Sequence, residues 1–86
     1  MVGERLRALR LQAGLTQEQL ADAAGMDRLE ITRIERGPLK ASLAATRRKL
    51  AVGFGVTLDL MDAYLEGLAD VSDVIGAADP PTAAAS

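Results

Sequence analysis

The chain has 86 residues, a formal net charge of −2 and 49% apolar residues, which suffices for one domain around a single hydrophobic core. It contains no cysteine and no histidine, which excludes disulfides, thiolate and imidazole metal sites, cysteine nucleophiles and catalytic triads, so we expect no enzyme, no metal and no cofactor. No apolar stretch approaches the roughly 20 residues that cross a bilayer, and no secretory signal is evident, so the sequence predicts a cytoplasmic protein without a membrane partner.

The charges are distributed unevenly along the chain. All ten basic residues precede residue 51 and are accompanied there by six acidic residues, so residues 1–50 carry a net charge of +4. The remainder holds six acidic residues and no basic residue, which gives −6. This asymmetry is typical of a protein in which one part faces phosphate and another does not, with segregation by chance as the alternative.

The first two predicted elements are helices separated by a glycine. Apolar residues at helical spacing predict a helix over residues 3–13, and Gly14 stands where a left-handed residue would end it. Thr16 followed by Gln19 has the form of a capping box, in which a hydroxyl and a side-chain amide satisfy the free N–H groups at a helix start. The second helix is therefore expected over residues 17–24.

The same capping pattern begins a third helix. Asp27 is followed three residues later by Glu30, so we expect a helix over residues 27–36, with Glu30 as part of its cap and Gly37 at its end. Only residues 25–27 connect the second and third helices. This connection is too short for an antiparallel return, and it suits a steep crossing with a glycine at the bend.

Two further helices are expected in the second half of the chain. Ser42 is the candidate N-cap of a fourth helix, which the sequence Gly-Phe-Gly at residues 53–55 should break, and Thr57 is the N-cap of a fifth. The fifth helix has two apolar faces, so it needs two surfaces to pack on. One face is formed by Leu58, Met61 and Leu65, and the other by Leu60, Tyr64 and Leu68.

The C-terminal part of the chain is expected to add little to the core. Residues 68–75 keep apolar side chains at helical spacing and predict a short sixth helix. Residues 76–86 combine prolines with small residues and have almost nothing to bury, which predicts a disordered tail. Since no alternation typical of strands is present, the predicted fold class is all-α, a compact five-helix domain with this sixth helix and tail.

The turn between the second and third helices resembles a known motif. Its residues are Leu15-Thr16-Gln17, Leu20-Ala21, Ala24-Gly25-Met26, Ile31-Thr32-Arg33-Ile34-Glu35 and Gly37. With these, residues 3–60 resemble the Cro/C1-type helix-turn-helix family, also called the XRE family. The resemblance implies a lambda-repressor-like DNA-binding domain over residues 1–67, in which the third helix enters the major groove and the N-terminus of the second lies against phosphate.

The resemblance also places candidate DNA contacts on these helices. With Ile31 and Ile34 turned inward, the candidates for contacting bases are Arg28, Leu29, Thr32 and Arg33. The arginines suit guanine, and Leu29 or the Thr32 methyl group suits the thymine methyl group, while a phosphate contact or a solvated charge is the alternative for each arginine. The candidates for contacting phosphate are Thr16, Gln17, Arg36, Lys40 and Ser42.

Two more roles follow from the family. Arg10 and Glu35 match a pair that commonly joins the first and third helices, so they are interpreted as a structural salt bridge. Because one helix-turn-helix touches few base pairs, family members usually bind paired half-sites as dimers. We expect a dimerisation segment at 68–75, unless the chain's own tail packs there instead. The candidate dimer interface is Leu60, Tyr64, Leu68, Val71 and Ile75.

The sequence thus predicts a sequence-specific transcriptional regulator, most simply a nucleoid-associated homodimeric repressor that binds double-stranded DNA at a palindromic operator. The alternative is an antitoxin-like protein-interaction module that binds a partner protein through the acidic C-terminal region, from Asp59 to Asp79. A DNA-binding body with a partner-binding tail combines the two. The sequence does not separate a phage-type repressor, an antitoxin-like autoregulator and a restriction controller.

Overall fold

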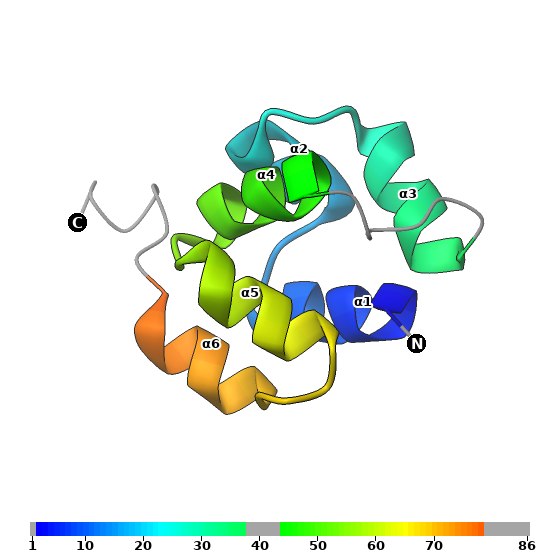
Figure 1. Cartoon of the computed structure of the whole chain (residues 1–86). Helices are drawn as coiled ribbons and strands as arrows, with labels where there is room; N and C mark the ends of the chain where they lie inside the picture. Colours follow the sequence, from blue (N-terminus) through cyan, green and yellow to red (C-terminus); the bar gives the residue numbers. More distant parts are fainter. Residues whose placement is uncertain (1, 38–43, 79–86) are drawn as a thin grey trace.

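The computed structural model describes residues 2–37 and 44–78. Its helices are α1 (Val2–Gln12), α2 (Gln17–Ala24), α3 (Arg28–Arg36), α4 (Ala44–Phe54), α5 (Leu58–Leu65) and α6 (Val71–Ala77) (Figure 1). No strand occurs in these two ranges, so the predicted all-α fold class is confirmed. None of the helices described has the length and the apolar composition that crossing a membrane would require.

The second helix begins and ends as its sequence predicts. The Thr16 hydroxyl accepts the Gln19 N–H at 3.0 Å, and the Gln19 side chain accepts the Thr16 N–H at 2.9 Å, which completes the capping box. At the other end Gly25 has a φ of 67°, in the left-handed region where a Cβ atom is strained. The chain therefore turns sharply and reaches α3 within three residues.

The third helix starts one residue later than predicted. Asp27 is the capping residue and has an extended backbone, so the first helical residue is Arg28. The Asp27 N–H donates to the Glu30 carboxylate at 3.2 Å, which confirms Glu30 as part of the cap. The helix ends at Gly37.

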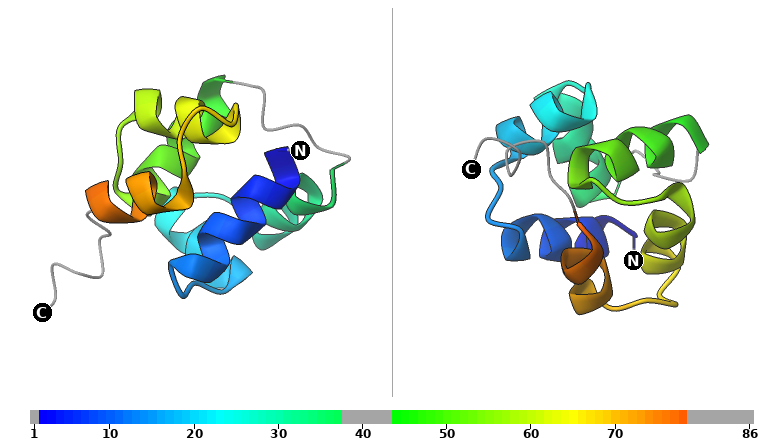
Figure 2. Two further views of the ribbon diagram at one scale, coloured as in Figure 1. Left: turned by 90° about the horizontal axis from the view of Figure 1, so that it is seen from below. Right: turned by 90° about the vertical axis from the view of Figure 1, so that its left-hand side faces the viewer.

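One continuous core holds the helices together. Figure 1 shows α3 and α6 at opposite ends of the domain, and α1 packs against both of them (Figure 2). Burying each large apolar side chain contributes about 1.5–3 kcal/mol, so the core is the main source of stability. Its fully buried large side chains are Leu6, Leu9, Leu20, Ile31, Ile34, Leu50, Phe54, Met61, Tyr64 and Val74.

The fourth helix corrects the expectation that residues 53–55 would break it. Gly53 lies inside α4, which runs to Phe54. A Cβ atom at Gly53 would lie 2.9 Å from the Cβ of Ala24 and 3.2 Å from a methyl carbon of Leu20, so this glycine permits the close crossing of α4 and α2. The expected N-cap Ser42 lies outside the described residues.

The sixth helix is shifted from its predicted position. It begins at Val71 instead of residue 68 because Asp70 caps it. The N–H of Asp70 donates to the Asp73 carboxylate at 2.9 Å. It extends to Ala77, so the first two residues assigned to the tail are helical, whereas 79–86 lie outside the described residues. Val74 is fully buried between α6 and its neighbours α1 and α5. The chain's own C-terminal segment therefore packs on α5, while Leu68 of the second face stays 82% exposed.

This packing corrects one predicted dimer residue. Tyr64 is 1% exposed, and its hydroxyl donates to the carbonyl of Arg5. The Arg5 guanidinium donates in turn to the carbonyls of Tyr64 and Ala69, and its central carbon lies 4.3 Å from the centre of the tyrosine ring. Tyr64 is consequently a core residue that ties α5 to α1, and it is not available to a second chain.

Candidate nucleic-acid interface

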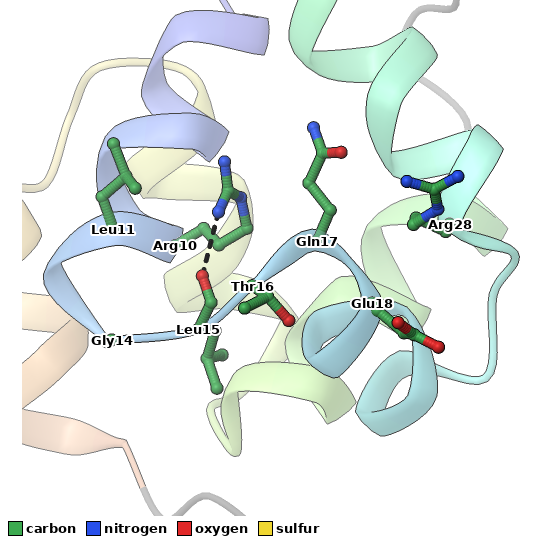
Figure 3. Close-up of a pocket in the computed structure, with 8 residues that line it drawn as sticks. All are labelled: Arg10, Leu11, Gly14, Leu15, Thr16, Gln17, Glu18 and Arg28. Atoms are coloured by element: carbon green, nitrogen blue, oxygen red, sulfur yellow. Dashed lines mark hydrogen bonds between the residues drawn. The ribbon is translucent and has the colours of Figure 1, made fainter.

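The N-terminus of α2 opens onto a shallow depression between α1 and α3 (Figure 3). The Thr16 cap satisfies the N–H groups of Gln19 and Leu20, but those of Gln17 and Glu18 have no partner within the helix. These groups and the positive end of the helix dipole suit an anion such as a phosphate. The Thr16 hydroxyl accepts in the cap and so retains its own hydrogen for donation.

The side chain of Gln17 is held from two directions. Its Nε2 donates to Glu35 Oε1 at 3.2 Å, and its Oε1 accepts from the Thr32 hydroxyl at 3.0 Å. Both partners belong to α3, and Figure 3 shows Gln17 between Arg10 and Arg28. The candidate phosphate contact is therefore linked directly to the predicted recognition helix.

Glu35 also forms an ion pair with Arg10. Arg10 Nε lies 2.7 Å from Glu35 Oε2 and Nη2 lies 3.1 Å from Oε1, a two-pronged geometry that suits guanidinium and carboxylate. The two side chains are only 10% and 4% exposed. A third bond from Arg10 Nη1 to the carbonyl of Leu15, at 2.9 Å, fixes the segment that leads into α2. One arginine thus joins α1, α3 and the start of α2.

The outer face of α3 presents polar and apolar groups side by side. Ile31 and Ile34 are buried, whereas Arg28, Leu29 and Arg33 are exposed. Leu29 is 58% exposed and lies beside Arg28, so an apolar group adjoins a cationic one on this face. Arg28 and Arg33 form no ion pair with any described residue, Glu30 included. Their guanidinium groups are therefore available to a ligand.

Two arginines flank a second depression beside this face. Arg7 of α1 and Arg36 of α3 are exposed, and they line it together with Gln17 and Glu35. Arg7 is not among the candidate residues predicted from the sequence, although it lies one helical turn before Arg10 and so shares its side of α1. We call Arg7, Arg28, Arg33 and Arg36 the basic face.

The acidic half of the chain lies elsewhere. Arg47 of α4 is buried against α5, with Nη1 3.3 Å from Asp62 and Nη2 3.1 Å from Glu66, so it serves an internal contact. Asp59, Asp70 and Asp73 are exposed on α5 and α6. The charge asymmetry of the sequence therefore separates α3 from the C-terminal helices. Two further phosphate candidates, Lys40 and Ser42, lie outside the described residues.

Comparison with known families agrees with this geometry. A family model described as a helix-turn-helix domain matches residues 2–64, which include all of α1, α2 and α3 and reach into α5. Comparison with curated proteins and with solved structures gave no match.

Proposed function

Because the chain belongs to the helix-turn-helix domain family, we propose that it is a sequence-specific transcriptional regulator of the Cro/C1 type, whose α3 enters the DNA major groove. The observation that carries this proposal is the outer face of α3, where unpaired arginines and an exposed leucine adjoin the N-terminus of α2. A recognition helix needs such a mixture, because bases are distinguished by hydrogen bonds and by the thymine methyl group.

The candidate DNA-contacting side chains divide into those that suit bases and those that suit phosphate. Arg28 and Arg33 suit two hydrogen bonds to guanine O6 and N7, and Leu29 or the Thr32 methyl group suits thymine. Each arginine that forms both bonds to guanine contributes roughly 1–3 kcal/mol of discrimination against a wrong base. The phosphate contacts are assigned to Thr16, Gln17, Arg36, Lys40 and Ser42. Arg7 is added to them because it lines the same depression as Arg36.

Repression through a palindromic operator requires two copies of the chain. With Tyr64 buried, the surface left for a homodimer contains Leu60, Leu68, Val71 and Ile75. Leu68 is 82% exposed, and Ile75 is also exposed, whereas Leu60 and Val71 already pack partly on the chain's own core. Paired half-sites would then lie about 34 Å apart, one turn of DNA.

The proposal is tested by fluorescence anisotropy on labelled duplexes, starting with the DNA upstream of the chain's own gene and with scrambled competitors. We expect tight binding to one duplex, and an affinity that falls with salt with a logarithmic slope of about −0.9 per phosphate neutralised. Arg33→Ala should weaken binding and relax the preference at one base pair, whereas a uniform loss with a reduced salt slope would assign Arg33 to phosphate instead. Arg33→Lys is the matched control, since it keeps the charge but not the two-pronged bond to guanine.

Equal affinity for the upstream and scrambled duplexes would instead favour the second candidate function, an antitoxin-like module that binds a protein partner. The observation that favours it is the exposed C-terminal surface, which combines Asp59, Asp70 and Asp73 with Leu68. In that case the partner should be captured by the wild type and lost in Leu68→Ser.

A further inference from the structure

Each hydrogen bond around Gln17 can run in only one direction, from a fixed donor to a fixed acceptor. A guanidinium only donates and a carboxylate only accepts, so Glu35 takes bonds from Arg10 and requires the NH2 group of Gln17 to face it. The amide oxygen of Gln17 then faces the opposite side. There it accepts the Thr32 hydroxyl at 3.0 Å. This sequence of donors and acceptors leaves one N–H of Gln17 without a partner among the described residues.

The Thr32 hydroxyl has one hydrogen and two acceptors within reach. The second acceptor is the carbonyl of Arg28, at 3.1 Å, one turn earlier in α3. A threonine inside a helix commonly donates to such a carbonyl. In that case its hydroxyl would form no hydrogen bond to another helix. The bond to Gln17 is of similar length, and it connects two helices.

We propose that the Thr32 hydroxyl is a positioning group for DNA binding. Together with Glu35 it holds the Gln17 amide in one orientation, in the depression that Arg7 and Arg36 also line, so that the remaining N–H can donate to a phosphate oxygen there. Gln17 has three rotatable side-chain bonds, and fixing them before binding reduces the entropy lost on binding. This inference rests on the proposed function, to which it adds a role for a hydroxyl distinct from that of the Thr32 methyl group.

Two variants separate the hydroxyl from the methyl group. Thr32→Val removes the hydroxyl but keeps a methyl group and the branched shape, whereas Thr32→Ser keeps the hydroxyl and removes the methyl group. We expect Thr32→Val to weaken binding about fivefold, the equivalent of one net hydrogen bond. The loss should be the same on every single-base-pair variant of the duplex that the wild type binds tightly. Thr32→Ser should keep the affinity, except where a thymine methyl group was contacted.

The salt dependence and a double-mutant cycle complete the test. Because the amide is neutral, Thr32→Val should leave the salt slope unchanged, unlike the loss of an arginine–phosphate contact. Thr32→Val should have no further effect in a Gln17→Ala background, since both changes remove the same contact. Thermal unfolding followed by circular dichroism establishes that each variant is folded at the temperature of the binding assay.

The outcomes distinguish this inference from the proposed function. Thr32→Val binding as tightly as the wild type, or losses that add fully with Gln17→Ala, would overturn the positioning role while the regulator proposal stands. Losses of equal size in Thr32→Ser and Thr32→Val would overturn it as well. If the wild type binds all duplexes equally, sequence-specific regulation is refuted, and the same cycle on scrambled DNA still decides the role of Thr32. A wild type that binds no DNA overturns both.

Discussion

Replacing Arg10 with methionine tests how much the ion pair to Glu35 contributes to the free energy of unfolding. The substitution keeps much of the apolar stem but leaves a carboxylate that is 4% exposed with Gln17 as its remaining hydrogen-bond donor. Removing one partner of a buried pair costs about 3–5 kcal/mol, and the bond to the Leu15 carbonyl is lost as well. Because Gln17 still compensates part of the charge, we expect the lower end, about 3 kcal/mol.

For a domain of this size, about 3 kcal/mol corresponds to a fall in Tm of roughly 12–24 °C, which circular dichroism at 222 nm resolves easily. The control is the double variant Arg10→Met with Glu35→Leu, which removes both charges. Apolar replacements of a whole buried pair are often neutral, so the double variant should recover most of the lost stability. A Tm unchanged in Arg10→Met would refute the assignment of this pair as a structural element.

Three further predictions concern stability and assembly. Gly53→Ala should destabilise by about 1–3 kcal/mol in urea unfolding, because its Cβ would meet that of Ala24, and Ala24→Gly in the same chain should restore part of this loss. Burial raises the pKa of Tyr64 above its ordinary value of 10.0, while Arg5 opposes the shift. The contribution of Tyr64 to the free energy of unfolding should therefore be fully present below pH 10 and be lost as pH rises through the folded-state pKa. Tyr64→Phe should not show this loss. Leu68→Ser should leave Tm unchanged yet weaken any dimer measured by sedimentation, and an unaltered dimer would exclude this surface.

The features that could be predicted from the sequence are local ones. The capping boxes at Thr16 and Asp27 involve residues only three positions apart, so their helices start within one residue of the prediction. Gly53 was misinterpreted because its role depends on Ala24, on another helix. The bonds between Arg5 and Tyr64 join residues 59 positions apart, and no local pattern indicates them.

The same distinction applies to the candidate site. Helical periodicity alone turns Arg33 away from the buried isoleucines, and Arg28 is exposed at the first position of α3. The network of Gln17 with Thr32 and Glu35 depends on how α2 crosses α3, and that crossing follows from side-chain packing in three dimensions. Sequence therefore identifies which residues are candidates for contacting DNA, whereas the structure shows which of them hold one another in place.

The hydrogen-bond network that runs from Arg10 through Glu35 and Gln17 to Thr32 links the stability of the fold to the proposed DNA contact at Gln17. At one end Arg10 and Glu35 are buried, so their loss must lower the stability of the fold. At the other end Thr32 is only partly buried, and its hydroxyl lies within hydrogen-bond distance of the Gln17 amide oxygen and of the carbonyl of Arg28. Gln17 lies between them and bonds to both ends. A change at Glu35 should therefore disturb binding even in a protein that remains folded, because it releases the amide that Thr32 alone does not hold.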